Sequence, residues 1–469
     1  MPRSAEQLRS DVERIWRAGV AAVQPDRLIP EHVQVDGHWL LIGDDTIDLQ
    51  QVERIAVVGA GKAAGAMAAA VEIVLGPKRI AGKHLHGWVN VPADCLIPTE
   101  RIRLHAARPA GINEPRPEGV EGTQQILSIA SALGPRDLCL GLFTGGGSAL
   151  LPAPVPEVTL DEKIRLTRLL SAAGANIEQL NIVRSQLSLI KGGGLARACR
   201  ARQLVSLIIS DVLGDRLDII ASGPTVRSNA TAADALQILS ELKLTSDNSI
   251  LNVVTYLQSR AAADSVNTAP ATGNRNNCKA HPSRCAISNH VIANNATAVD
   301  AAGVEAERLG YSHAMIAARH SEGAAEEVGR HLAEMALRMR AESGPDCLIS
   351  GGEPTVTLAD ESVRGKGGRN QQLALAALAQ LGDCHDIALL AAGTDGEDGP
   401  TNAAGAFVTE EIARTSREKQ RAAADYLARN DAYSFFHASR GLFITGPTHT
   451  NVCDLRVIAT ARIAAPEHR

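Results

Sequence analysis

Residues 365–371, Gly-Lys-Gly-Gly-Arg-Asn-Gln, combine groups that can bind an anion. Their glycines let backbone N–H groups approach a ligand closely, and Lys366 and Arg369 supply positive charge. Arginine also presents a planar fork that suits phosphate or carboxylate. An apolar run at 373–381 follows and predicts a helix, whose N-terminus would itself attract an anion. A flexible basic hairpin is the alternative interpretation of this segment.

Glycine-rich turns follow short apolar runs at six other places. Runs of this kind are typical of parallel sheets, whose ligands bind at the carboxyl ends of the strands. The runs span residues 55–58, 138–143, 205–209, 347–350, 387–392 and 441–444. Their turns contain the candidate binding residues Gly145, Gly146, Gly147, Ser148, Ser210, Asp211, Gly351, Gly352, Glu353 and Asp395.

Carboxylates recur on these same turns, at Asp211, Asp215, Glu353, Asp395 and Asp398. A single aspartate in a turn usually satisfies backbone N–H groups. Several of them beside glycines and cations are the components of phosphoryl transfer, in which carboxylates hold Mg²⁺ or accept a proton. The pattern therefore favours a kinase.

A predicted helix at 176–195 carries a polar stripe of Asn181, Arg184, Ser188 and Lys191 next to an apolar stripe. We expect this stripe to line the wall of a cleft. A solvated helix face is the alternative interpretation.

The sequence lacks the signature motifs of several other enzyme classes. Gly59, Gly61 and Gly65 resemble a dinucleotide-binding turn, but residues 78–83, where a ribose-binding carboxylate is expected, contain none. Lys62 in that turn suits phosphate or carboxylate instead. A Walker A motif, a GxSxG elbow and an HExxH helix are all missing from the sequence.

The composition favours a multidomain protein of the cytoplasm. The chain has 469 residues, 3% aromatic residues and a net charge of −5, which argues for two or three aliphatic cores and against a nucleic-acid binder. No apolar run reaches membrane-spanning length, and the eight cysteines form no CxxC pair. We therefore expect reduced thiols and neither nucleic acid nor membrane as a partner.

Strands and helices alternate through residue 224, which predicts a doubly wound α/β domain, and a second series starts at 345. We expect domains at 1–238 and 239–469, with a polar insertion near 258–285. Cys278, His281, Cys285 and His290 have a spacing that could hold zinc, but the polar composition favours a disordered insertion.

The motifs together resemble class II glycerate kinases, also called glycerate 2-kinases. The N-terminal domain of that family is similar to residues 60–63, 144–149, 181–193, 210–215 and 222–225. Its C-terminal domain, called MOFRL, is similar to residues 351–355, 365–371, 393–399, 430–436 and 445–452. His449 and Cys453 depart from the pattern, because the family commonly has glycine and asparagine there.

The resemblance implies a Rossmann-like α/β/α sandwich followed by an α/β MOFRL domain, with the active site in the interdomain cleft. It implies ATP-dependent phosphorylation of D-glycerate with Mg²⁺, usually to 2-phosphoglycerate. Some relatives are labelled hydroxypyruvate reductases, so an NAD(P)H-dependent reductase is the alternative, and a non-catalytic nucleotide sensor is a third hypothesis. The position of the transferred phosphate and a homodimeric state stay open.

Lys62 and Arg369 are the family's catalytic cations by this resemblance, expected to neutralise the phosphoryl group and anchor the glycerate carboxylate. Asp211 is the expected general base or metal ligand. The remaining assignments are Asp395 as a second Mg²⁺ ligand, Asn181, Arg184 and Lys191 as cleft residues, and Gly145, Gly146, Gly147, Ser148, Ser210, Gly351, Gly352, Glu353 and Asn370 as substrate or nucleotide contacts.

Overall fold

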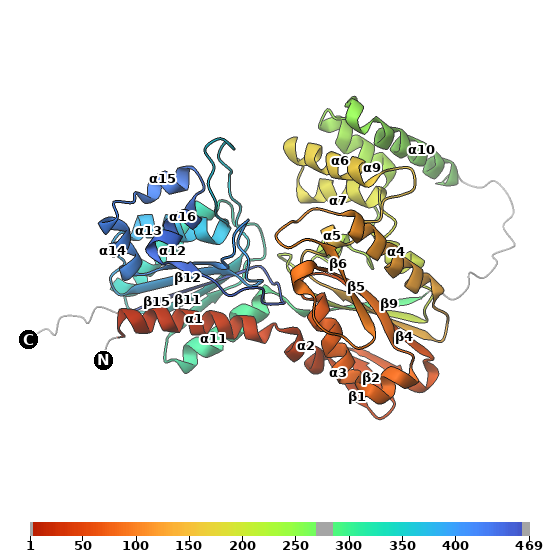
Figure 1. Ribbon diagram of the computed structural model, residues 1–469, viewed down its shortest axis with the longest axis horizontal. Coiled ribbons are helices and arrows are strands. Elements are labelled where there is room, and N and C mark those ends of the chain that lie inside the picture. The colour runs from red at the N-terminus through yellow and green to blue at the C-terminus, as the bar shows by residue number, and fades with distance from the viewer. Residues whose placement is uncertain (1–2, 269–284, 462–469) are drawn as a thin grey trace, which may run out of the picture. The chain divides into compact units, whose positions relative to one another are not determined.

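A computed structural model describes residues 3–268 and 285–461 (Figure 1). The chain forms two compact units. Unit 1 comprises Met1–Leu28, Ile209–Asp215 and Ala293–Arg469, and unit 2 comprises Ile29–Ile208 and Arg216–Ile292. This division differs from the expected single boundary at residue 238, because the chain passes between the units more than once. No helix among the described residues is both long enough and apolar enough to span a membrane.

Unit 2 is built on a six-stranded sheet in the order β6-β5-β4-β7-β8-β9, in which the strands from β6 to β8 pair in parallel. The strands are β4 (Arg54–Ala60), β5 (His86–Pro92), β6 (Ile102–Arg108), β7 (Asp137–Phe143), β8 (Gln203–Ile209) and β9 (Ala286–Ala293). The order reverses between β4 and β7. Right-handed crossovers therefore place α3 (Ala64–Gly82) and α4 (Pro117–Ala132) on opposite faces, which confirms the doubly wound prediction.

A helical group and a small sheet complete unit 2. Helices α6 (Leu160–Ala172), α7 (Ile177–Gln186), α9 (Ala232–Glu241) and α10 (Leu251–Thr268) share one apolar core that includes Leu166, Val183 and Leu239. Strands β1 (Val33–Asp36), β2 (Trp39–Ile42) and β3 (Asp45–Asp48) form an antiparallel sheet. Short helices α2 (Pro25–His32), α5 (Gly147–Leu150) and α8 (Gly194–Ala198) connect these parts.

The prediction of a single helix at 176–195 is wrong. Helix α7 ends at Gln186, because the next residues pair with a neighbouring segment instead: the Val155 N–H donates to the Leu187 carbonyl (3.3 Å) and the Leu189 N–H to the Ala153 carbonyl (2.9 Å). Lys191 therefore lies in the turn before α8 and not on the same helix as Arg184.

Unit 1 contains a mixed sheet in the order β10-β11-β15-β12-β13-β14. Figure 1 shows α1 (Ala5–Ala22) and α11 (Asn295–Arg308) on one face of this sheet and the remaining helices on the other. The strands are β10 (His313–Ile316), β11 (Cys347–Gly352), β12 (Ile387–Gly393), β13 (Gly405–Val408), β14 (Leu442–Phe443) and β15 (Asp454–Thr460). The other helices are α12 (Ala325–Ala341), α13 (Arg369–Leu381), α14 (Glu410–Glu418), α15 (Ala423–Ala428) and α16 (Ala432–Ser439).

The sheet of unit 1 differs from the parallel sheet that its apolar runs suggest. Strand β15 lies between β11 and β12 and is antiparallel to both. The carboxyl ends of β11 and β12 consequently meet the amino end of β15 at one edge, where Gly352 and Gly393 each lie opposite Asp454. This edge positions the functional groups of unit 1.

Helix α1 belongs to the core of unit 1 although it begins the chain. Its buried stripe includes Leu8, Val12 and Trp16, which pack with residues of β12 and β15. The Trp16 ring meets Phe443 edge to face at 4.9 Å between ring centroids. Burying side chains of this size contributes about 1.5–3 kcal/mol each, so the helix is fixed to this sheet.

Candidate active site

Lys62 lies in the turn after β4, where the strand order of unit 2 reverses. Its backbone N–H donates to the Gly145 carbonyl (3.0 Å), and the Thr144 N–H donates to the Ala60 carbonyl (3.1 Å). Gly61 has φ +145°, and a Cβ there would collide with the Thr144 hydroxyl. The turns after β4 and β7 are thus fastened together at the position where doubly wound sheets bind ligands.

Two cations flank Gly146 in this turn. A Cβ built on Gly146 would lie 3.6 Å from Lys62 Cγ and 3.5 Å from Arg108 Nη2. Arg108 ends β6, is buried, and donates to the Ile112 carbonyl. Sequence reasoning missed Arg108, although a basic residue at the carboxyl end of a strand is a usable signal.

Ser148 brings together two residues of the predicted polar stripe. Its hydroxyl accepts hydrogen bonds from Arg184 Nη2 and Lys191 Nζ, both at 2.7 Å. Its own hydrogen then points to the Ser222 hydroxyl at 2.9 Å, which in turn donates to Asn181 Oδ1 at 3.5 Å. The Asn181 Nδ2 at the end of this chain is buried and has no hydrogen-bond partner among the described residues.

Ser222 holds a backbone conformation that side chains rarely adopt. Its φ is +61°, and Ala221 before it has φ +49°. The Gly192 N–H donates to the Ser222 carbonyl (3.0 Å), which anchors the turn after Lys191 to this strained segment. Strain of this kind concentrates at functional sites, and here it directs the Ser222 hydroxyl onto Ser148.

A third cation, Lys163 of α6, lies near Arg184 and Lys191, and its Nζ donates to the Leu187 carbonyl at 2.8 Å. Burial and, to a smaller extent, the charge of Arg184 lower the pKa of Lys163 to about 7. Burial also lowers the pKa of Lys191 and of Arg184 from their usual ranges. In the described part of the chain, none of the three has an ion pair with a carboxylate. An anionic ligand is the natural counterion.

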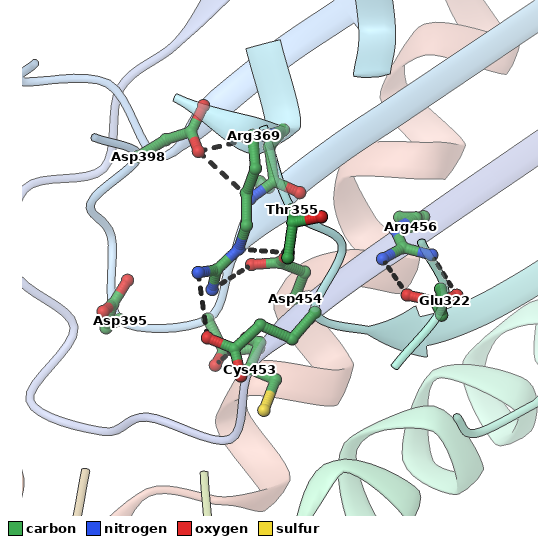
Figure 2. A network of polar contacts seen from close by, with 12 residues as sticks. Glu322, Thr355, Arg369, Asp395, Asp398, Cys453, Asp454 and Arg456 are labelled. Carbon is green, nitrogen blue, oxygen red and sulfur yellow. Dashed lines mark hydrogen bonds and ion pairs between the residues drawn. The ribbon is translucent and has the colours of Figure 1, made fainter. Parts of the chain in front are cut away.

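Arg369 forms the centre of the polar network of unit 1, shown in Figure 2. Its Nε and Nη2 donate to the two carboxylate oxygens of Asp454 (2.7 and 2.9 Å), and its Nη1 donates to Glu353 (2.9 Å). Asp454 is fully buried, whereas the Arg369 side chain keeps 34% of its exposure. Sequence reasoning missed Asp454, which begins an apolar strand and is brought here by the antiparallel β15.

The N-terminus of α13 binds an anion, as residues 365–371 predicted, but the anion is a carboxylate of the protein. Asp398 accepts the backbone N–H groups of Asn370 (3.0 Å) and Gln371 (2.8 Å) and the Asn370 amide (3.3 Å). A Cβ on Gly368 would collide with Asp398, so glycine is required there. In this structure the N–H groups of the motif hold Asp398 rather than a ligand.

Acidic groups outnumber Arg369 at this edge of the sheet. Burial raises the pKa of Glu353 to about 7; Arg369 opposes the rise, and the charges of Asp454, Asp211 and Asp395 add to it. Burial likewise raises the pKa of Asp398 to about 7. Carboxylates raise one another's pKa when they lie close together, and a bound cation would stabilise their ionised forms.

Asp211 and Asp395 lie on separate loops of unit 1. Asn451 Nδ2 donates to Asp211 at 3.3 Å, and Cys453 Sγ donates to the Asp211 carbonyl at 2.9 Å. The Glu397 N–H donates to Asp395 at 3.0 Å. Among the described residues, no group of three or more His, Cys, Asp or Glu is arranged to hold a metal. Mg²⁺ in kinases needs only one or two carboxylates besides phosphate, so these residues fit it.

The other predicted binding residues shape the turns. The Ser210 N–H donates to the Ala293 carbonyl (2.9 Å), and its hydroxyl accepts from the Val212 N–H (3.3 Å). Side chains would not fit at Gly351 and Gly352, because Asn295 and Glu322 pack directly against them. Glu322 in turn pairs with the buried Arg456 through two contacts at 2.9 and 2.7 Å (Figure 2).

His449 and Cys453 both have positive φ, at +58° and +68°. Glycine and asparagine tolerate this region best. The departures from the family pattern therefore fall at two positions where the backbone itself favours those residues.

Two features of the sequence, the glycine turn at 59–65 and the cysteine–histidine spacing at 278–290, can be compared with the described residues. Residues 78–82 belong to α3, and the strand that follows the glycine turn is β5; a carboxylate, that of Asp94, stands two residues after β5. Its Oδ1 is buried without a partner among the described residues. Of the zinc candidates, Cys278 and His281 lie outside the described residues, as does most of the polar insertion, and His290 pairs with Asp45 at 2.7 Å.

The chain matches two protein families: one described as a domain of unknown function, DUF4147, over residues 11–258, and the MOFRL family over residues 346–454. It is 36% identical to the glycerate kinase of Rattus norvegicus over 97% of this chain and 94% of that protein. It is 34% identical to the D-glycerate 2-kinase of Thermotoga maritima over 96% of this chain and 98% of that one.

The chain is also similar to a crystal structure of glycerate kinase from Thermotoga maritima, with a TM-score of 0.75 and 32% identity. The similarity covers 97% of this chain and 100% of the chain in that structure. A protein of Agrobacterium vitis with the provisional name hydroxypyruvate reductase is 36% identical over 86% of this chain and 99% of its own length. The chain belongs to the glycerate kinase family.

Proposed function

We propose that this protein is an ATP-dependent kinase that phosphorylates D-glycerate, with 2-phosphoglycerate as the product. The observation that carries this proposal is the group of buried cations around Ser148, which has no acidic partner among the described residues. Glycerate, ATP and the phosphorylated product are all anions. Membership of the glycerate kinase family supports the choice of substrate.

The cations of unit 2 divide into two groups in this proposal. Lys62 and Arg108 border the glycine turn at Gly146, where backbone N–H groups can hold phosphate oxygens. Arg184 and Lys191 contact Ser148, and together with the nearby Lys163 they would hold a second anionic group, for which the glycerate carboxylate is the proposed occupant. Asn181 Nδ2, which is buried without a described partner, would donate to that group.

The carboxylates of unit 1 supply the complementary charge. Asp211 and Asp395 would hold the Mg²⁺ that accompanies ATP, and the ion would offset the negative charge of the phosphates. Arg369 fixes Glu353 and Asp454 and, being one third exposed, is proposed together with Lys62 to contact the transferred phosphoryl group.

The reaction needs one proton acceptor. The acceptor hydroxyl of glycerate attacks the terminal phosphorus of ATP, the bond from that phosphorus to ADP breaks, and the hydroxyl proton moves to a carboxylate. Asp211 is the proposed acceptor, because its carboxylate lies at the end of the apolar run at 205–209 and is positioned by the Asn451 amide at 3.3 Å.

A coupled assay with ATP, Mg²⁺ and D-glycerate, followed by ³¹P NMR of the product, tests the proposal. We expect ATP consumption that depends on D-glycerate, and a phosphate on the 2-position. The reductase hypothesis predicts NAD(P)H oxidation with hydroxypyruvate instead, and Asp94 after β5 keeps that assay necessary. Reductase turnover without ATP consumption, or ATP binding without turnover on any small hydroxy acid, would overturn the kinase proposal.

A further inference from the structure

Three thiols lie in a row in unit 2, away from the residues discussed so far. Cys139 is in the middle of β7, Cys199 follows α8 directly, and Cys285 precedes β9. The Sγ atoms of Cys199 and Cys285 are 3.8 Å apart, and Cys199 also contacts Cys139. All three are free cysteines. Two residues 86 apart in sequence thus bring their sulfurs into contact.

The backbone holds the two outer cysteines close together. The Ala286 N–H donates to the Arg202 carbonyl at 3.0 Å, so the residue after Cys285 is tied to the segment that begins at Cys199. A disulfide has a sulfur–sulfur distance of about 2.05 Å. The sulfurs would therefore have to approach each other by less than 2 Å from their present 3.8 Å.

Exposure and electrostatics differ along the row. Cys139 and Cys199 are buried, at 0% and 3% exposure, whereas Cys285 is partly exposed. The thiols of Cys139 and Cys285 donate to Cys199, which lowers the pKa of the Cys199 thiol and raises the pKa of the other two. Two thiols whose sulfurs are in contact, one of them accessible to a small disulfide, have the geometry that thiol–disulfide exchange requires.

We propose that Cys199 and Cys285 form a reversible disulfide and are a redox-modification site of this protein. The oxidant class is a small disulfide such as oxidised glutathione. The Cys285 thiol loses its proton to solvent, and the resulting thiolate attacks one sulfur of the oxidant, whose S–S bond breaks and releases one glutathione thiolate. Cys199 then attacks the mixed disulfide and releases the second glutathione, so two protein thiols are oxidised while one glutathione disulfide is reduced to two thiols.

The cross-link would join the segment after α8 to the start of β9. The same α8 follows the turn that contains Lys191, so oxidation reaches the part of the chain that holds the cations around Ser148. A link between residues far apart in sequence also restricts the unfolded chain. We therefore expect the oxidised protein to unfold at a higher temperature than the reduced protein.

The test uses the full-length protein, fully reduced and then equilibrated with oxidised glutathione. We expect the intact mass to fall by two hydrogen atoms, one proteolytic peptide pair linked through Cys199 and Cys285, reversal by dithiothreitol, and a raised midpoint of thermal unfolding. Cys285→Ser should abolish all four results, because the position is partly exposed and the serine is nearly isosteric. Cys278→Ser, outside the described residues, is the matched control and should change none of them.

Cys199→Ser is a second test variant. It cannot form the internal disulfide, so after equilibration with oxidised glutathione we expect only a mixed disulfide between glutathione and Cys285. A link that persists in Cys285→Ser, a link that joins Cys278 or Cys139 instead, or a protein that keeps all its thiols when glutathione is largely oxidised would overturn the proposal.

Discussion

Arg369 and Asp454 form a two-point ion pair, with Nε–Oδ2 at 2.7 Å and Nη2–Oδ1 at 2.9 Å. The pair joins the first residue of α13 to the first residue of β15, and the remaining Nη1 of the guanidinium holds Glu353 at the end of β11. One side chain therefore fixes three elements at the edge of the sheet that carries the acidic groups.

Asp454→Asn should weaken both the fold and the activity. The substitution removes the negative charge from a fully buried position and leaves Arg369 with Glu353 as its partner. Breaking a buried pair costs about 3–5 kcal/mol, and we expect a loss of about 3 kcal/mol in the free energy of unfolding because Arg369 is partly exposed. Urea denaturation measures the loss, and exposed Asp44→Asn is the control. An unfolding free energy equal to that of the native chain would contradict this role.

Lys191→Met should lower activity without lowering stability. Lys191 is 3% exposed and donates to Ser148 and Ser222 hydroxyls, but no carboxylate offsets its charge among the described residues. A methionine of similar length removes that buried charge, so the temperature of unfolding should stay the same or rise. A hydrogen bond to a charged group is worth about 1.5–3 kcal/mol, which corresponds to a loss of about tenfold or more in kcat/KM.

Lys78→Met, on the exposed part of α3, is the matched control and should leave both quantities unchanged. A Lys191→Met enzyme with full activity would mean that the cations around Ser148 do not touch the substrate.

Lys163 should make stability increase with pH. Its pKa in the folded protein is lowered to about 7 from an ordinary 10.5, so between these pH values the unfolded chain binds more protons than the folded one. The free energy of unfolding therefore rises from about pH 7 toward pH 10.5 and is lower below pH 7. Lys163→Met should lack this rise, which urea denaturation at several pH values can measure.

An anion bound near Lys163 favours its charged form and should reduce the same pH dependence. The measurement is therefore repeated with saturating D-glycerate and with inorganic phosphate. Identical pH profiles for Lys163→Met and the native chain, without ligand, would contradict the lowered pKa.

The sequence predicted several strands correctly because their apolar runs are continuous and end in glycine-rich turns. The runs before Gly59, Thr144 and Ser210 all form strands. Their turns were correctly recognised as the positions of charged residues. The family resemblance then ordered these motifs, and the comparisons confirm the family.

What the sequence could not show was which core each element joins. The apolar stripe of α1 fits any sheet, and only the structure places it in unit 1. The reversed direction of β15 has no local signal, and Asp454 was missed for that reason. Lys163 was missed because α6 has an ordinary amphipathic pattern, and its role depends on Arg184 and Lys191 from other segments.

Lys62 belongs to unit 2 and Arg369 to unit 1, and both are proposed to contact the transferred phosphoryl group. If both contact the same transferred phosphoryl group, removing either should lower kcat/KM by about 10³ or more, as arginine contacts in phosphoryl transfer do. Arg369→Lys should stay poor as well, because a single ammonium cannot reproduce the two-point contact with Asp454. Arg414→Ala, on an exposed position of α14 in unit 1, is the control.

The combination of the two substitutions decides whether the two cations act together. When two groups stabilise the same transition state together, removing the second group after the first lowers kcat/KM only a little further. The double variant Lys62→Ala with Arg369→Ala should therefore have nearly the same kcat/KM as either single variant. Steady-state kinetics of the four proteins give this comparison directly. If the loss in the double variant equals the product of the two single losses, the cations act on separate steps or separate groups. If Arg369→Ala keeps near-normal kcat/KM while urea denaturation shows a weakened fold, Arg369 is a structural partner of Asp454 and Glu353 and not a catalytic residue.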